Sequence, residues 1–307
     1  MGALRSDKTI RASGQRQSGA PGRPEKPLAP GLYLVATPIG NLADITLRAL
    51  DVLKNADLVA CEDTRVTRKL LDHYGVRATL LRYDDHSGAA EREGLLARLR
   101  AGERVALVSD AGTPLVSDPG YKLLRAAAAE RIAIVPVPGA SAVLAALQVS
   151  ALPPDRFLFA GFLPPKSAAR RKAIAALAAV PATLVFYETG PRLAEALADL
   201  AEVLGPRAAA IARELTKLFE EVRRGSLAEL AAQYHDAPPP RGEIAVVVGP
   251  PAEDAETNAA DVDAMLARAL EVMTVRDAAA SVAEASGRPR KEVYRRALAL
   301  GAKGKHP

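Results

Sequence analysis

The sequence predicts an α/β protein with two α/β domains and a short helical extension at its C-terminus. Over residues 31–150, short apolar runs of strand length alternate with stretches of helical period. Over residues 151–250, strand-length runs follow one another with fewer helices between them, and residues 261–300 have helical period. Because regular alternation of strands and helices is typical of parallel sheets, we expect a mainly parallel first sheet and a mixed second sheet.

The composition excludes several classes of protein. The chain has 307 residues, of which 49% are apolar, and this is enough to build two cores. Its single cysteine, Cys61, excludes a disulfide framework and suits a cytoplasmic protein. No run of 18 apolar residues occurs, so we expect no membrane span. The four histidines have no cysteine partners at metal-ligand spacing, so we expect no metal site.

The basic residues are concentrated at the two ends of the chain. Residues 1–30 carry six basic and two acidic side chains, residues 275–307 carry eight and three, and the part between them has a net charge of −4. Basic ends on an acidic body indicate contact with nucleic acid, although solvated tails have the same composition. Residues 1–30 lack apolar stretches and predict a disordered basic arm.

Strand and helix patterns divide the rest of the chain into domains. We expect an N-terminal α/β domain over 31–150, with strands at 31–37, 57–62, 79–83, 104–109 and 131–137 and a helix at 64–75 that Gly75 ends. Two prolines in 150–156 mark the start of a C-terminal α/β domain over 151–250, with strands at 157–162, 182–188, 208–214, 219–225 and 243–249 and two clear helices. Residues 251–307 combine a polar linker with three helices whose outline is that of a helix-turn-helix.

The stretch "VALVSDAGTPLVSDPG" (105–120) is the first candidate for a ligand site. A buried strand ends at Asp110 and is followed by Ala111 and Gly112, which leave the backbone open to a ligand. In open α/β sheets, ligands bind beyond the carboxyl ends of the strands. Asp110 is suited to accept hydrogen bonds from ribose hydroxyls, or it caps a turn. The sequence lacks G-x-G-x-x-G and G-x-x-x-x-G-K-[ST], which favours a nucleoside-like cofactor without a pyrophosphate.

Other strand ends carry further candidates. "CEDTR" (61–65) places three charged or hydroxyl-bearing side chains after the second strand, where they either act on a polar substrate or cap a helix. In the second domain, charged residues follow the strands and either face the cleft between the domains or pair on the surface. These residues are Glu188, Arg192, Arg213, Glu214 and Lys217.

Seven motifs together resemble a known family. They are "LYLVATPIGNLADIT", "ACEDTR", "LVSDAGTPLVSDPG", "PVPGASA", "FYETGPR", "RELTK" and "GEIAVVVGP", in this order over residues 31–250. This combination resembles ribosomal RNA small subunit methyltransferase I, within the tetrapyrrole methylase-like superfamily of S-adenosylmethionine enzymes. The resemblance implies two α/β domains with the cofactor between them and a homodimer. It also implies 2′-O-methylation of a cytidine in the decoding region of 16S rRNA, with the rRNA in the small ribosomal subunit as the expected partner. Whether naked rRNA suffices as acceptor or an assembled subunit is required stays open at this point.

The resemblance also implies which residues form the site. Cofactor-binding residues are expected at Thr37, Pro38, Asp110, Ala111, Thr113, Ser141, Ala142, Phe162, Leu163, Arg213 and Ala245. The reaction needs no metal, since the sulfonium already makes its methyl group electrophilic, but the ribose hydroxyl must lose or share its proton. Glu62 and Asp63, at the ligand edge, are the candidate bases, and Arg65 and Lys217 are candidates to bind RNA phosphates.

Two other functions remain open at this point. A tetrapyrrole C-methyltransferase would keep the fold and the cofactor, but it usually has a Gly-rich loop after the first strand, where this sequence has "TPIGN". A non-catalytic RNA-binding protein of ribosome assembly would use the basic ends and would leave the loop motifs without a function.

Overall fold

The computed structural model describes residues 28–84, 86–117, 119–251, 259–286 and 288–303. The predicted arm therefore lies outside the described residues except for its last three. These three already belong to the fold, because Leu28 packs against the first domain's core and the Tyr33 hydroxyl donates a 2.6 Å hydrogen bond to the Ala29 carbonyl.

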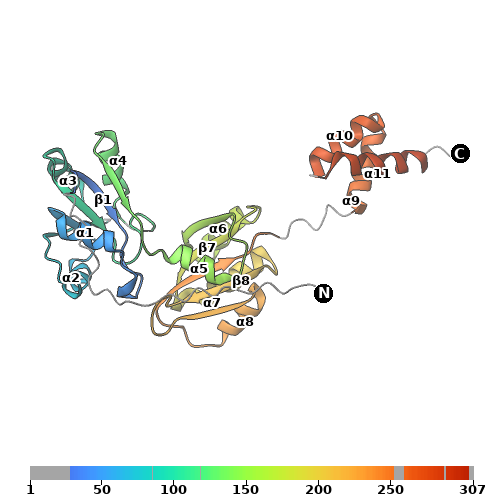
Figure 1. Ribbon diagram of the computed structural model, residues 1–307. Coiled ribbons are helices and arrows are strands. Elements are labelled where there is room, and N and C mark those ends of the chain that lie inside the picture. Colours follow the sequence, from blue (N-terminus) through green and yellow to red (C-terminus); the bar gives the residue numbers. More distant parts are fainter. Residues whose placement is uncertain (1–27, 85, 118, 252–258, 287, 304–307) are drawn as a thin grey trace, which may run out of the picture.

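The first sheet is parallel throughout and has the strand order β3-β2-β4-β1-β5. Figure 1 shows the domain that it forms, in blue to green. Its strands are β1 (Gly31–Val35), β2 (Leu58–Cys61), β3 (Leu80–Arg82), β4 (Arg104–Val108) and β5 (Ile134–Val137). Both faces of a parallel sheet are normally covered by the connecting helices, and the central strands here are almost wholly buried. The predicted strand positions and the α/β class are confirmed.

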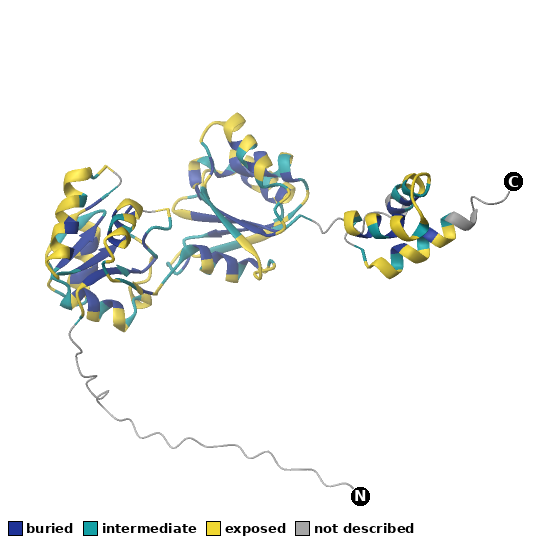
Figure 2. Cartoon of the chain, turned by 90° about the horizontal axis from the view of Figure 1, so that it is seen from above, coloured by how far each residue is buried: buried dark blue, intermediate teal, exposed yellow. Residues whose placement is uncertain are grey.

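Alternate residues of these strands feed two separate cores. Leu32, Val105 and Leu107 pack on one face against α3 (Ala89–Arg100) and α4 (Tyr121–Ala129). Tyr33, Val35 and neighbouring strand residues pack on the other face against α1 (Leu47–Asn55) and α2 (Thr64–His73). This follows from the two-residue period of a strand, which sends successive side chains to opposite faces. Figure 2 shows the buried strands between helices whose outer faces are exposed.

The second sheet is mixed, as expected, and has the order β6-β7-β10-β8-β9. Its strands are β6 (Phe157–Phe162), β7 (Thr183–Thr189), β8 (Ala208–Arg213), β9 (Glu221–Ser226) and β10 (Glu243–Val248). Only β6 and β7 are parallel neighbours. One face packs against α6 (Ser167–Leu177), α7 (Gly190–Leu204) and α8 (Leu227–His235). The pattern analysis missed α8, which follows β9 directly and begins with a capping box between Ser226 and Glu229.

The other face of the second sheet packs against α5 (Ala142–Ser150). Val143, Ala146 and Leu147 of this helix lie in one core with strand residues such as Val185 and Val247. By packing, α5 belongs to the second sheet, so the chain passes from one domain to the other between β5 and α5. This is earlier than residue 150, because the prolines that suggested the boundary follow α5 and lie inside the second packing unit.

The C-terminal extension contains α9 (Ala259–Leu270), α10 (Val275–Ser286) and α11 (Arg290–Lys303), which enclose a small core of their own. Each helix contributes to this core, for example Val262 from α9, Val282 from α10 and Val293 from α11. The predicted three-helix outline is confirmed, whereas most of the predicted linker lies outside the described residues. Among the described helices, none has the length and apolar character needed to cross a membrane.

Candidate active site

The carboxyl ends of the first sheet's strands lead into the loops that form the candidate site. Val35 of β1 pairs in register with Val108 of β4 and Val137 of β5, and Val108 also pairs with Cys61 of β2. Because these strands are parallel, the loops after them start at one edge of the sheet. A pocket of about 320 Å³ lies at this edge, between it and the second sheet, and we call it the first pocket.

Both domains contribute to the wall of the first pocket. The first domain and its connection to α5 supply Ile39, Glu62, Asp110, Ala111, Gly112, Thr113, Val116, Ser117, Ser141 and Ala142. The second domain supplies Phe162, Tyr187, Glu188, Thr189, Ala212, Leu215, Gly242, Glu243, Ile244 and Ala245. Of the site residues expected from the sequence, the pocket brings together Glu62, Asp110, Ala111, Thr113, Ser141, Ala142, Phe162 and Ala245.

Backbone and hydroxyl hydrogen bonds hold the loop after β4 against the loop after β1. The amides of Thr37 and Gly112 each donate to the other's carbonyl, at 2.9 and 3.1 Å. The Thr37 hydroxyl donates to the Ser109 carbonyl, and the Ser109 hydroxyl donates to the Gly112 carbonyl, both at 3.1 Å. Gly112 has a φ of 84°, a backbone conformation that favours glycine. The open loop is therefore held in one shape without a ligand.

The loop after β5 is tied to the same assembly. The Thr113 hydroxyl donates a 3.0 Å hydrogen bond to the Ala140 carbonyl. Ser141 is the N-cap of α5, so the unpaired amides of that helix start at the pocket. Thr113 and Ser141 thus both line the pocket and fix its walls.

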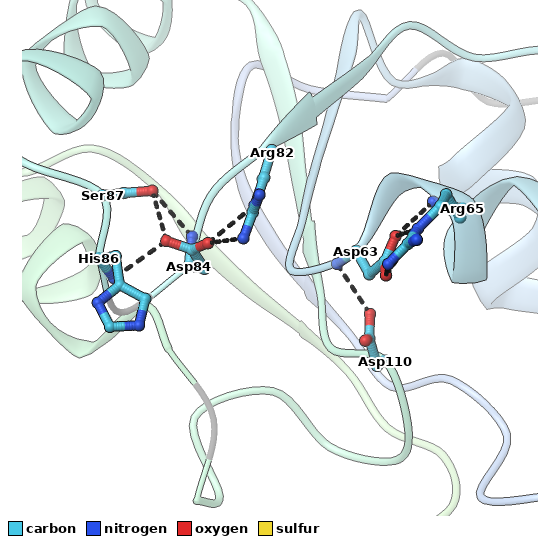
Figure 3. A network of polar contacts seen from close by, with 7 residues as sticks. All are labelled: Asp63, Arg65, Arg82, Asp84, His86, Ser87 and Asp110. Atoms are coloured by element: carbon cyan, nitrogen blue, oxygen red, sulfur yellow. Dashed lines mark hydrogen bonds and ion pairs between the residues drawn. The ribbon is translucent and has the colours of Figure 1, made fainter.

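Asp110 lies between β4 and the end of β2 (Figure 3). Its Oδ1 accepts a 3.0 Å hydrogen bond from the Asp63 amide, which orients the carboxylate at the pocket wall. Partial burial raises the pKa of Asp110, against the opposing effect of this hydrogen bond. The result is a desolvated acceptor that is suited to a hydroxyl or a cationic group of a ligand.

The two candidate bases are placed differently. Glu62 lines the first pocket, whereas Asp63 is the N-cap of α2 and accepts a 2.8 Å hydrogen bond from the Arg65 amide. The Arg65 guanidinium is 2.6 Å from the same carboxylate and lowers the pKa of Asp63 to about 2 (Figure 3). A carboxylate with so low a pKa is a poor proton acceptor, so the geometry favours Glu62 over Asp63.

The second domain supplies an apolar wall made of small and aromatic side chains. Ala245 of β10 pairs in register with Ala212 of β8 and Tyr187 of β7. The Tyr187 ring lies 5.6 Å from that of Phe162, centroid to centroid, and Phe162 is 51% exposed. Tyr187, Ala212 and Leu215 also line this wall, although the sequence did not predict them as site residues. Strand alternation places Tyr187 and Ala212 on the face of Ala245, but this became visible only once the register between the strands was known.

Two expected cofactor residues in the second domain do not line the pocket. The Leu163 side chain is buried in the second domain's core. Arg213 pairs with Glu221 at 3.2 Å and donates to the Arg241 carbonyl. Each follows a residue that does line the pocket, Phe162 or Ala212. Because neighbouring strand residues point to opposite faces, an offset of one position removes the side chain from the site.

Three of the remaining expected residues line a second pocket, of about 390 Å³, beside the first. Thr37 and Pro38 lie here, and so does Lys217, whose Nζ is 2.8 Å from Glu214 and 2.9 Å from Glu243. The positive charge of Lys217 is therefore balanced by two carboxylates. Arg65 is 86% exposed and paired with Asp63.

The other charged candidates of the second domain, Glu188 and Arg192, form an ion pair in which only the glutamate is buried. The Glu188 side chain is 1% exposed, and its Oε1 is 3.2 Å from Arg192 Nε and accepts from the Thr189 amide at 2.8 Å. This arrangement stabilises the start of α7. Over the residues that the structure describes, no cluster of three or more histidine, cysteine or acidic side chains is arranged to hold a metal ion.

The chain resembles known proteins over nearly its whole length. Residues 31–231 match the model of the family described as Tetrapyrrole (Corrin/Porphyrin) Methylases, and residues 256–301 match the RsmI C-terminal HTH domain. The ribosomal RNA small subunit methyltransferase I of Mesorhizobium japonicum is 54% identical over 278 residues, which are 90% of this chain and 94% of the relative. The enzyme of the same name from Erythrobacter litoralis is 56% identical over 275 residues, 90% and 97% of the two chains.

This chain belongs to the ribosomal RNA small subunit methyltransferase I family. The seven motifs predicted membership of this family, and the prediction is confirmed. The prediction that the protein is a methyltransferase is confirmed as well. The match to the family's C-terminal domain confirms that the last three helices form a helix-turn-helix unit.

Solved structures confirm the fold of the two α/β domains. The uroporphyrin-III C-methyltransferase of Thermus thermophilus, in complex with S-adenosyl homocysteine, has a TM-score of 0.50 and 21% identity. The similarity covers 71% of this chain and 97% of that one. This chain thus shares the fold of its two α/β domains with an enzyme named for a tetrapyrrole.

Proposed function

We propose that this protein transfers the methyl group of S-adenosyl-L-methionine to the ribose 2′-oxygen of a cytidine in the decoding region of 16S rRNA. The first pocket, which joins a desolvated carboxylate, a loop with small side chains and an apolar wall, is the observation that carries the proposal. The family to which the chain belongs and its C-terminal helix-turn-helix match support RNA as the acceptor.

The residues of the first pocket fit a nucleoside-bearing methyl donor. Asp110 accepts hydrogen bonds from ribose hydroxyls, and the backbone next to Ala111 and Gly112 lets a polar group approach the main chain closely. The apolar surface of Tyr187, Ala212 and Ala245 suits the flat adenine ring. When bound, S-adenosyl-L-methionine supplies a methyl carbon that its positive sulfur makes electrophilic.

The protein's own contribution to the chemistry is positioning and proton removal. The hydrogen-bonded loops fix the donor so that acceptor oxygen, methyl carbon and sulfur can be brought nearly into line. As the new O–C bond forms and the C–S bond breaks, the 2′-hydroxyl proton passes to a base, for which we propose Glu62. Asp63, the other candidate, then serves to cap α2 and to orient Asp110 through its amide.

The decisive experiment offers labelled S-adenosyl-L-methionine to three acceptors: small ribosomal subunits, naked 16S rRNA and uroporphyrinogen III. We expect label in RNA only. Alkaline hydrolysis then locates it, because a 2′-O-methyl group prevents the neighbouring phosphodiester from being cleaved and leaves a labelled dinucleotide. Transfer to the tetrapyrrole alone would favour the C-methyltransferase function, and transfer to none, with no donor binding, would favour a non-catalytic RNA-binding protein.

The proposal extends to the setting in which the enzyme acts. We place it in the cytoplasm as a homodimer that acts on 16S rRNA within the small subunit, as its resemblance to the family implies. Light scattering of the full chain tests the dimer. A comparison of initial rates on assembled subunits and naked rRNA tests the context of the acceptor.

A further inference from the structure

The second pocket is lined by apolar, hydroxyl-bearing and charged side chains from four parts of the molecule. The loop after β1 supplies Thr37, Pro38, Ile39, Gly40 and Leu42, and α2 supplies Val66, Thr67, Lys69 and Leu70. The loop after β4 supplies Ser109, Asp110 and Ala111, and the second domain supplies Lys217 and Glu243.

The second pocket shares part of its wall with the first. Ile39, Asp110, Ala111 and Glu243 line both. Methyl transfer requires the nucleophile to lie about 3–3.5 Å from the methyl carbon, so donor and acceptor must occupy adjoining sites. The two pockets adjoin at Asp110 and Ala111 and therefore satisfy this requirement.

A contact between the domains forms one side of the second pocket. A Cβ on Gly40 would collide with the Lys217 side chain, so the stem of this lysine lies directly against the loop after β1. The ion pairs of Lys217 with Glu214 and Glu243 hold it there. The second pocket is thus built when the two domains come together, as an acceptor site between them requires.

The lining is suited to one unpaired nucleoside of an RNA strand. Leu42 and Val66 are apolar yet 37% and 40% exposed, and they offer a surface on which a base can pack. Lys69 lies at the rim on the same helix as Arg65, one turn away, and within the described part of the chain no carboxylate pairs with Lys69. The exposed apolar side chains of Leu42 and Val66, with Lys69 in the same lining, match a base joined to its phosphate.

We propose that the second pocket receives the acceptor nucleoside, flipped out of its strand, and that Lys69 binds a phosphate next to it. The inference rests on the proposed function and adds the place where the RNA enters. Base extrusion of this kind is the general solution when an enzyme must reach a nucleotide that pairing or stacking covers.

The first test uses Val66→Trp, whose larger side chain should fill the second pocket. We expect kcat/KM for small ribosomal subunits to fall at least tenfold, while the Kd for S-adenosylhomocysteine in calorimetry and the thermal midpoint stay within error of the wild type. Leu81→Trp is the matched control, since Leu81 is 38% exposed and lines neither pocket, and it should change none of these values. Unchanged transfer in Val66→Trp, or an equal loss of S-adenosylhomocysteine binding, would overturn the assignment.

The second test measures the phosphate contact through its salt dependence. We expect Lys69→Gln to reduce the slope of log Kd against log salt for rRNA by about one, as the loss of one phosphate contact does. Lys122→Gln, an exposed lysine on α4, should leave the slope unchanged. An unaltered slope in Lys69→Gln removes Lys69 from the RNA contact. If the wild type itself transfers no methyl group to RNA, the proposed function fails and this inference fails with it.

Discussion

The backbone amide of Asp63 donates a 3.0 Å hydrogen bond to the Asp110 carboxylate, which joins the ends of β2 and β4 at the ligand edge (Figure 3). An adjacent aspartate thus contributes its main chain to the site while its side chain caps α2. Asp63 and Asp110 look equivalent in the sequence, but Asp110 offers its carboxylate to the site and Asp63 offers its backbone amide. The first predictions test this difference.

Asp110→Asn should weaken binding of S-adenosyl-L-methionine by about ten- to one-hundredfold, because a hydrogen bond to a charged group contributes about 1.5–3 kcal/mol. Calorimetry measures the change. Burial raises the pKa of Asp110 in the folded protein. The ionised carboxylate therefore destabilises the ligand-free protein at pH values above the pKa that Asp110 has in the unfolded chain. The same variant should therefore have a slightly higher thermal midpoint at neutral pH. A lower midpoint would contradict this account of Asp110.

Donor binding should also depend on pH through Asp110. The wild-type affinity should fall as the pH drops through the raised pKa, since the protonated carboxyl loses its capacity to accept. Asp110→Asn should show a flatter profile over the same range. Titrations at several pH values, with the fold checked by circular dichroism, distinguish this effect from acid unfolding.

Glu62→Gln should lower the single-turnover rate of methyl transfer by about one-hundredfold or more and leave donor affinity unchanged, as loss of a general base does. Asp63→Asn, which keeps an N-cap of similar quality, should change that rate less than threefold. Rapid quenching with a saturating donor measures both. Equal rates in the wild type and Glu62→Gln would show that positioning suffices without this base.

The buried pair of Arg170 and Asp199 should dominate the stability of the second domain. Arg170 is 1% exposed, and its Nε lies 2.6 Å from Asp199, which also accepts from the Ser167 hydroxyl. Asp199→Ala should lower the free energy of unfolding by about 3–5 kcal/mol, because it leaves the buried guanidinium with only the exposed Glu195 carboxylate, at 3.3 Å, as its ionic partner. Urea denaturation measures this loss, and the double variant Arg170→Met with Asp199→Leu should recover much of it.

Two glycines should respond to alanine in opposite directions. A Cβ at Gly190, at the start of α7, would collide with the Pro240 carbonyl, so Gly190→Ala should unfold at lower urea concentration. Gly94 lies within α3 with open space around it, and Gly94→Ala should gain about 0.5–1 kcal/mol from helix propensity. A change of the same sign in the free energy of unfolding of both variants would refute the steric explanation.

The ion pair of Asp57 and Arg104 should make the stability of the folded protein depend on pH in the acid range. The hydrogen bonds from Arg104 lower the pKa of Asp57 to about 2, so its contribution is complete above the unfolded pKa near 3.8 and is lost as the pH falls through about 2. The thermal midpoint of Asp57→Asn should therefore lie below that of the wild type at neutral pH. The difference should shrink between about pH 4 and pH 2.

The sequence by itself determined the order of strands and helices, the α/β class and the loops that face the ligand. Local patterns carry this information, as when Gly75, with a φ of 62°, ends α2 where the sequence predicts. The tertiary structure alone decided that α5 covers the second sheet, that Ala212 rather than Arg213 lines the site, and that Thr37 and Pro38 belong to the second pocket. The physical reason is that a strand shows its period but not its partner, so the register between distant strands decides which of two neighbouring side chains reaches a ligand.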